Sequence, residues 1–389
     1  MSVFNVCHWS LCSIRVRIPV KERPTTTYGL NLLQISVTGI CYECLTQIYG
    51  TAAKTRECMI TAVIYSESGG TFKTTMTANL AVALERMGQN TLMIDLDPQE
   101  GNLTSLFDAG EHRNDPDADN LVKHILDMPD GDFHDLIETT AEGVDIIPSH
   151  DMLSDFTSNL EQKISYETGM QNMSREEYPR FELLYDLLWK EQKLNEEYDA
   201  VLIDPNARAE DLLYNAIFAL RTLIAPVKPA GKGNLSLEGL EELVGNMESQ
   251  LDIEIGLSCV VPSGVGRTNA HKQYQDQFEN TEAFATPVTI ANRESLMDAM
   301  WEARGSAFKV IEERWKTFEK NGEMISESGQ RRIREREVET LYKLYKLAWF
   351  IATDTFDADA DPVLELNIQD YDNQVLDLED DDKMEATTA

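Results

Sequence analysis

Apolar and polar positions alternate along the middle of the chain in an order typical of a parallel sheet. Short apolar runs, rich in β-branched residues, predict strands, and longer stretches with apolar residues at helical spacing separate them. The predicted strands are Ile60–Tyr65, Thr91–Ile94, Val144–Ile147, Ala200–Ile203, Thr222–Val227 and Glu254–Val261, and the predicted helices are Thr74–Met87, Glu182–Leu194 and Leu235–Met247. This alternation predicts an α/β fold with a mostly parallel sheet between two helical layers.

Beyond about Trp301 the pattern changes to long, charged helices and then to an acidic tail. The stretch Leu341–Ala352 is apolar and aromatic, and we favour packing onto the core over a membrane-seeking amphipathic helix. No run approaches the roughly 18 consecutive apolar residues of a membrane span, so we expect no membrane partner. We predict three parts after residue 58, which are a folded α/β core at 59–305, a helical extension at 306–353 and a disordered acidic tail at 354–389.

The first 58 residues differ in chemistry from the rest of the chain. They carry six basic and three acidic side chains and five of the six cysteines. We expect a non-native or disordered N-terminal extension, with the natural start at Met59, directly before an apolar strand. The alternative is a small zinc site that includes Cys41-x-x-Cys44, although a single pair with this spacing is a weak signal. The remaining residues hold only Cys259, which is typical of a cytoplasmic protein.

The whole chain carries a formal net charge of −34, and the acids extend over its whole body. This charge argues against a generally basic nucleic-acid binder. Dense surface carboxylates are typical of proteins that work in concentrated salt, so we expect a halophilic archaeal source. An acidic mesophilic protein with an acidic tail is the alternative.

The loop after the first strand contains the candidate chemistry. Ser68–Thr75 reads S-G-G-T-F-K-T-T and joins a buried strand to the start of a helix. Glycines let such a turn wrap a phosphate closely, and the helix N-terminus favours an anion. Lys73 is placed to reach the outer phosphates, and the Thr74 hydroxyl to ligate Mg²⁺. The structural alternative is an ordinary strand–turn–helix junction with a surface lysine.

This loop resembles the deviant Walker A loop of the ParA/MinD family of partitioning ATPases, K-G-G-x-G-K-T-[ST]. Four later segments are similar to that family's motifs and occur in the family's order. They are Leu92–Asn102, similar to the switch I segment, Gly143–Ser149, similar to the G-x-x-I-I-P-S strand, Tyr198–Asp204, similar to the Walker B strand, and Ala225–Leu240, similar to V-P-V-x-P and S-L-x-G-L. The chain is thereby identified as a member of this family, with the ParA/Soj branch favoured over MinD.

The resemblance implies a P-loop fold and a role for each matching residue. Lys73 is expected to act in catalysis and Asp97 to orient the attacking water, while Thr74, Asp204 and Asp97 are expected at Mg²⁺. The expected nucleotide-binding residues are Gly69, Gly70, Thr71, Phe72, Lys73, Thr74 and Thr75. Turn capping before Pro98 is the alternative role of Asp95 and Asp97.

The sequence departs from the family pattern at the loop itself. Ser68 stands at the signature lysine, Glu67 at the first Walker A glycine, and Phe72 at the glycine before the P-loop lysine. A missing cation removes stabilisation of the transition state, so slow or absent hydrolysis is an alternative. Lys228 and Lys232 are candidate replacement cations.

The resemblance implies a function in plasmid or chromosome partition. The cofactors would be ATP and Mg²⁺, and the partners a second copy of the chain in an ATP-dependent homodimer and a ParB-like protein. Non-specific DNA is a further candidate partner through the basic cluster Arg331–Arg336, for which we favour a solvated helix face. The alternative function is a non-hydrolysing, nucleotide-dependent regulator or scaffold on the same fold.

Overall fold

The structure is a computed structural model of the chain. It describes residues 59–66, 72–100, 102–171, 173–206, 210–228, 237–266, 278, 280, 284–312, 335–358 and 360, all of which belong to one unit, Ser36–Ala389. Several predicted features lie outside the described residues: the segment 1–58 with its cysteines, the loop residues Gly69, Gly70 and Thr71, most of the cluster Arg331–Arg336, and the acidic tail beyond residue 360.

Eight strands of the described residues form one sheet in the order β3-β4-β2-β5-β1-β6-β7-β8. Their bounds are β1 Ile60–Ile64, β2 Thr91–Leu96, β3 Glu138–Thr139, β4 Asp145–Ile147, β5 Ala200–Pro205, β6 Thr222–Val227, β7 Gly256–Val265 and β8 Ile290–Ala291. β3 pairs with β4 in antiparallel register, and the other strand pairs are parallel. The predicted α/β fold with a mostly parallel sheet is confirmed.

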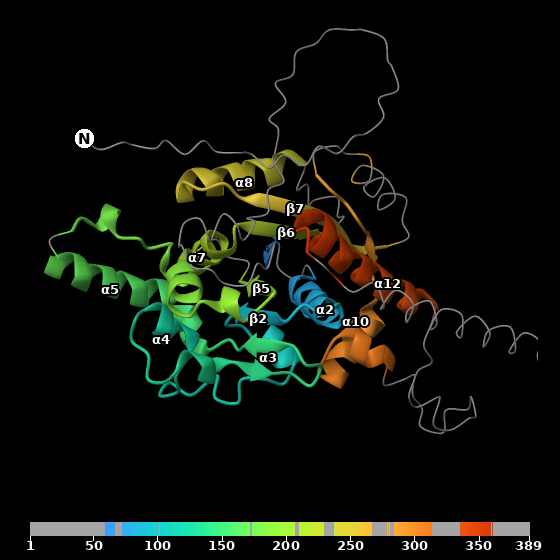
Figure 1. Ribbon diagram of the computed structural model, residues 1–389, viewed down its shortest axis with the longest axis horizontal. Helices are drawn as coiled ribbons and strands as arrows, with labels where there is room; N and C mark the ends of the chain where they lie inside the picture. The colour runs from blue at the N-terminus through green and yellow to red at the C-terminus, as the bar shows by residue number, and fades with distance from the viewer. Residues whose placement is uncertain are drawn as a thin grey trace, which may run out of the picture. The chain divides into compact units, whose positions relative to one another are not determined.

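Helices cover both faces of this sheet (Figure 1). The bounds of the described α-helices are α2 Lys73–Arg86, α3 Leu103–Leu106, α4 Leu121–Ile125, α5 Phe156–Gln171, α6 Leu183–Tyr185, α7 Asp211–Leu220, α8 Leu237–Leu251, α10 Glu294–Ala303 and α12 Glu335–Phe350. Helices α2, α3, α10 and α12 contribute to one hydrophobic cluster, and α4, α5, α6, α7 and α8 to the other. The central sheet therefore lies between two helical layers.

The strand sequences explain why both faces are covered. In β1, the side chains of Ile60, Ala62 and Ile64 belong to the first cluster, and that of Val63 belongs to the second. Successive side chains of a strand point to opposite faces, so a continuous apolar run needs a helical layer on each side. The short apolar runs of the sequence are therefore buried strands.

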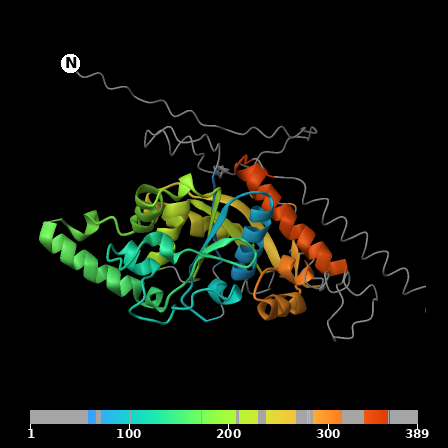
Figure 2. The same cartoon turned by 60° about the horizontal axis from the view of Figure 1, so that its bottom comes forward.

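The C-terminal helix α12 packs against α2 in the first layer, and both views show the two helices side by side (Figures 1 and 2). Leu341, Leu344, Leu347 and Ile351 recur at helical spacing and are buried. The expected packing of this apolar stretch onto the core is confirmed, and Phe308 and Ile311 join the same cluster. In the part of the chain that the structure describes, no helix is long and apolar enough to cross a membrane.

Most predicted elements differ from the observed ones by one or two residues at an end, and three differ more. The strand predicted at Glu254–Val261 is β7, which begins at Gly256 and continues to Val265, and the helix predicted at Leu235–Met247 is α8, which extends to Leu251. The helix predicted at Glu182–Leu194 is α6 followed by a π-helical segment, η4 (Asp186–Glu191). There the Gln192 amide donates to the Leu187 carbonyl at 2.9 Å, and Leu187 and Leu188 are both buried. The wider turn lets two consecutive leucines face the core.

Candidate functional site

The candidate site lies at the carboxyl edge of the sheet, where β1 is followed by the loop that leads to α2. β1 pairs with β5 on one side and with β6 on the other, while the chain that leaves β1 continues through α2 to β2, on the far side of β5. Strand order changes direction here, and ligands of α/β folds bind at such a switch point.

Phe72 and Lys73 begin α2. Phe72 is the N-cap residue and has a left-handed backbone (φ 44°, ψ 7°), and its carbonyl accepts the first helical hydrogen bond from the Met76 amide at 2.7 Å. Lys73, the first helical residue, is buried, with 8% of its surface exposed. A cation at the positive end of a 14-residue helix, with no acid in the first turn, favours a bound anion.

Thr74 contacts the end of the predicted Walker B strand. Its hydroxyl donates a hydrogen bond of 2.6 Å to Oδ2 of Asp204, which lies 130 residues further along the chain. The other carboxylate oxygen of Asp204, Oδ1, is buried and has no hydrogen-bond partner among the described residues. An unpaired buried carboxylate oxygen beside a hydroxyl fits a hard cation, because Mg²⁺ prefers oxygen ligands.

Burial shifts the acid–base equilibria of this site. Desolvation raises the pKa of Asp204 to about 8, the charge of Asp95 adds to the rise, and the bond from Thr74 and the charge of Lys73 oppose it. Desolvation also lowers the pKa of Lys73, against the charges of Asp204 and Asp97. Burial therefore favours the neutral forms of Asp204 and Lys73, and a bound ion of opposite charge would favour their charged forms.

Asp95 organises the turn after β2. One of its oxygens accepts from the Thr104 amide at 2.7 Å and the Thr104 hydroxyl at 2.6 Å, and the other accepts from the Asp97 amide at 3.0 Å. Burial nevertheless raises the pKa of Asp95 to about 7. These bonds agree with the capping role that the sequence left as an alternative for Asp95.

Asp97 lies two residues after Asp95 in this turn and is partly exposed. Its Oδ1 accepts from the Gln99 amide at 3.0 Å, so Asp97 also caps the turn, while its other oxygen accepts no hydrogen bond from the described residues. The capping bond leaves one carboxylate oxygen for a water molecule. The expected catalytic role of Asp97 stays a prediction.

The structure adds residues that the sequence did not single out. Thr104 links Asp95 to the Ser149 amide, to which its hydroxyl oxygen is bonded at 2.7 Å. Asn102 donates to the Asp97 carbonyl at 2.6 Å and to the Ser149 hydroxyl, and Arg113 donates to two carbonyls of the same turn. Asn102 and Ser149 occur in motifs of the resemblance, whereas no pattern in the sequence indicates Arg113.

Two further predicted residues contribute less to the site. Thr75 lies on α2, and its carbonyl accepts from the Asn79 side chain at 2.6 Å. Lys228 follows β6 and is exposed, and Lys232 lies outside the described residues. The structure therefore brings together Lys73, Thr74, Asp97 and Asp204 and gives no contact between Lys228 and this group.

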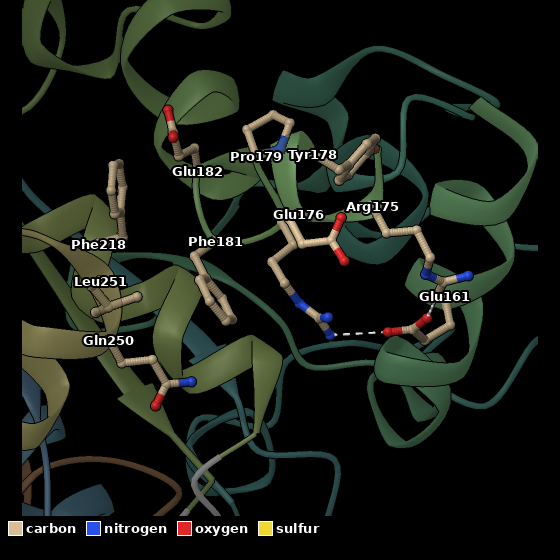
Figure 3. Close-up of a pocket in the computed structure, with 11 residues that line it drawn as sticks. Glu161, Arg175, Glu176, Tyr178, Pro179, Phe181, Glu182, Phe218, Gln250 and Leu251 are labelled. Atoms are coloured by element: carbon tan, nitrogen blue, oxygen red, sulfur yellow. Dashed lines mark hydrogen bonds and ion pairs between the residues drawn. The ribbon is translucent and has the colours of Figure 1, made fainter. Parts of the chain in front are cut away.

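The hollows on the described surface include two with different lining residues. One of about 280 Å³ adjoins the site and is lined by Pro98, Gln99 and Asn206, among others. The other, of about 490 Å³, is drawn in Figure 3, where Phe181, Phe218 and Leu251 lie on one side and Glu161 and Arg175 on the other. This second hollow shares no lining residue with the candidate site.

Comparison with known proteins identifies the family. A family model described as an AAA domain matches residues 59–254, which include every described residue of the candidate site. The chain belongs to this AAA domain family. The relatives described next are similar to this chain over the same region and include a ParA family protein.

Two relatives cover the same region of the chain. The sporulation initiation inhibitor protein Soj of Bacillus subtilis is 29% identical over 185 residues, which cover 47% of this chain and 63% of Soj. The virulence plasmid ParA family protein pGP5-D of Chlamydia psittaci is 25% identical over 222 residues, which cover 57% of this chain and 76% of that protein. The match to Soj therefore spans less than two thirds of its length.

A solved structure has the same fold as this AAA domain chain. It is a complex of a McdA variant from Cyanothece with ATP, with a TM-score of 0.53 at 22% identity, covering 76% of this chain and 96% of the solved chain. At this identity the similarity establishes the fold alone, which is the P-loop fold expected from the sequence.

Proposed function

We propose that this chain binds Mg–ATP at the carboxyl edge of its sheet and hydrolyses it. The observation that carries the proposal is the 2.6 Å hydrogen bond between Thr74 and Asp204, which joins the start of α2 to the end of β5. A hydroxyl at a helix N-terminus and a strand-end carboxylate are the two ligands that P-loop ATPases bring to Mg²⁺.

Each residue at this edge has a distinct task in the proposed reaction. Lys73 and the amide groups at the start of α2 bind the phosphates, and Thr74 with Asp204 holds Mg²⁺. Asp97 orients the attacking water through its free carboxylate oxygen. The bound metal ion supplies positive charge to the phosphate oxygens. Because Lys73 and Asp204 are buried, the site excludes bulk water and strengthens these charge interactions.

We further propose that the ATPase acts in the partition of a plasmid or chromosome. The support is the similarity to Soj and to a ParA family protein over the ATPase core. On this proposal the deviant Walker A loop governs an ATP-dependent homodimer, and a ParB-like protein stimulates hydrolysis. Non-specific DNA remains a candidate partner, and the halophilic origin stays a prediction from the charge of −34.

A specific observation favours a second candidate function, a non-hydrolysing nucleotide-dependent regulator. Phe72 replaces the glycine before Lys73 and has a left-handed backbone, which costs a non-glycine residue about 1 kcal/mol or more. Ser68 lacks the cation of the family pattern, and Lys228 makes no described contact with the site. Both features favour slower ATP hydrolysis, and not a loss of nucleotide binding.

ATP turnover separates the two functions. We would measure phosphate release by the full chain with Mg²⁺ in molar salt, and use Lys73→Ala as the background. Release above that background supports the ATPase, and tight nucleotide binding without release supports the regulator. Sedimentation with ADP and with a non-hydrolysable ATP analogue tests the dimer, and an unchanged mass in both nucleotides would contradict it.

A further inference from the structure

Arg113 holds the turn that carries Asp97, although it lies in the segment between α3 and α4. Its backbone is fixed on both sides, because its amide donates to the Gly110 carbonyl at 3.0 Å and its carbonyl accepts from the Asp151 amide at 3.1 Å. Its side chain is only 11% exposed, and Nε lies 3.8 Å from Asp151 Oδ1. The guanidinium group therefore has a defined position beside the candidate site.

The guanidinium group bonds to both ends of this turn. Nη2 donates to the carbonyls of Pro98 and Gln99 at 2.6 and 3.1 Å, directly after Asp97. Nη1 donates to Asn102 Oδ1 at 3.3 Å and lies 3.4 Å from the Ser105 hydroxyl. One planar group thus joins the start of the turn to the first residues of α3.

Asn102 extends this hold to Asp97 itself. Its Nδ2 donates to the Asp97 carbonyl at 2.6 Å, and its Oδ1 caps α3 by accepting from the Ser105 amide at 3.0 Å. Asp95 holds the same turn from the interior, through the amides of Asp97 and Thr104. Asp97 is therefore fixed from the buried side by Asp95 and from the outer side by Arg113.

Only an arginine can make this set of bonds. Its guanidinium group is planar and has five N–H donors in a fixed fork, whereas a lysine offers one compact charge. A lysine at position 113 would keep the charge near Asp151 but would leave a carbonyl of Pro98 or Gln99 without its donor.

We propose that Arg113 is a positioning residue that fixes Asp97, through the Pro98 and Gln99 carbonyls and Asn102, in the orientation needed for the attack of water on ATP. This inference rests on the proposed ATPase function. It assigns the chemical step, and not nucleotide binding, to Arg113, because none of its described contacts involves Lys73, Thr74 or Asp204.

The test compares Arg113→Lys and Arg113→Ala with Arg180→Lys in the full chain. Arg180 is a matched control, because its guanidinium group also makes two hydrogen bonds, in its case to the Asp211 carboxylate at 2.8 and 3.1 Å, but it lines the hollow that shares no residue with the site. The measurements are the affinity for a fluorescent ATP analogue, kcat, and hydrogen–deuterium exchange of a peptide covering residues 96–106.

We expect Arg113→Lys to lower kcat by about tenfold to 100-fold with nucleotide affinity within about twofold of the wild type. We also expect faster exchange of the 96–106 peptide, and neither change in Arg180→Lys. Unchanged exchange in Arg113→Lys, or equal losses of affinity and kcat, would overturn the inference.

If the wild type releases no phosphate, the proposed ATPase fails, and the exchange measurement still decides whether Arg113 holds the turn. If Arg113→Ala does not fold, Arg113→Lys alone decides.

Discussion

The ring of Phe72 lies directly over Gly264 of β7. A Cβ atom added at Gly264 would be 2.7 Å from Phe72 Cε2 and 3.4 Å from Cζ, and Gly264 itself has a φ of +72°. The residue that replaces a P-loop glycine is thus accommodated by a glycine elsewhere in the sheet. The two positions are coupled, and a side chain at Gly264 would displace the residue that precedes Lys73.

We therefore expect Gly264→Ala to weaken nucleotide binding as well as folding. The left-handed backbone costs alanine about 1–2 kcal/mol, and the ring contact forces Phe72 to move. Gly88→Ala is the matched control, because Gly88 has a φ of +83° and nothing within 4 Å of an added Cβ. Calorimetric titration with ATP should show weaker binding for Gly264→Ala only. Equal ATP affinities in the two variants would contradict the coupling.

Lys73 and Asp97 should fail in different ways. Lys73→Ala removes a charge that binds the phosphates in the ground state, so we expect nucleotide binding to be lost. Asp97→Asn keeps an oxygen for the Gln99 amide and removes only the carboxylate charge, so we expect binding near wild type and a fall in kcat of about 100-fold or more. Nucleotide titration and phosphate release on both variants check this, and wild-type affinity in Lys73→Ala would show that this loop is not the site.

The sequence predicted the strands of the core well, because each is a continuous apolar run that can be recognised without knowing which strands it pairs with. Thr222–Val227 was predicted with its observed bounds, and the acids Asp97 and Asp204 were placed at strand ends. The helices α5, α7 and α10 were not predicted. Much of the α5 surface is polar, and only Phe156, Leu160 and Ile164 are buried, so its apolar stripe is narrow.

The bonds that shape the candidate site are less accessible to sequence reasoning. Arg113 donates to the Pro98 carbonyl across a stretch of 15 residues that includes α3, and the ring of Phe72 lies close to Gly264, which is much further along the chain. Neither contact follows from spacing, because both depend on where the sheet places distant loops. The resemblance identified residue types at strand ends, whereas the hydrogen bonds that orient them required the structure.

The packing of α12 predicts a large effect of one buried side chain. Leu347 is fully buried between α12 and the core, so Leu347→Ala should lower the free energy of unfolding by about 2–5 kcal/mol. Lys346 is the preceding residue on the same helix and is exposed, so Lys346→Ala should change the free energy of unfolding by less than about 0.5 kcal/mol. Urea unfolding followed by circular dichroism measures both. Similar values for the two variants would argue against α12 as part of the core.

A chain that starts at Met59 should fold and bind nucleotide as well as the full chain. Met59 is 4% exposed and directly precedes β1, and the charge and cysteine content change at residue 58. Melting temperature and ATP affinity of the two chains should agree. A lower melting temperature of the shorter chain, or a bound metal ion that only the full chain retains, would favour the zinc alternative for Cys41 and Cys44.

The raised pKa values of Asp95 and Asp204 predict how stability and metal binding depend on pH. Both folded pKa values, about 7 and about 8, lie above the ordinary 3.8, so the folded chain without metal binds more protons than the unfolded chain between these limits. The contribution of the two groups to stability is therefore complete below about pH 4 and is lost as the pH rises towards 8. Binding of Mg²⁺ needs the ionised carboxylate, so its apparent affinity should rise by about tenfold per pH unit up to about pH 8.

Asp204→Asn isolates the larger of these effects, since asparagine does not titrate. Between pH 5 and about 8 the wild type without metal should lose stability relative to Asp204→Asn, and Mg–ATP should remove the difference for the wild type only. Asp298→Asn, at an exposed position on α10, is the control and should follow the wild type throughout. Thermal melting across this pH range makes the comparison. Parallel curves of melting temperature against pH for the wild type and Asp204→Asn would mean that Asp204 is already ionised without metal. A positive charge other than Mg²⁺ would then stabilise its unpaired oxygen.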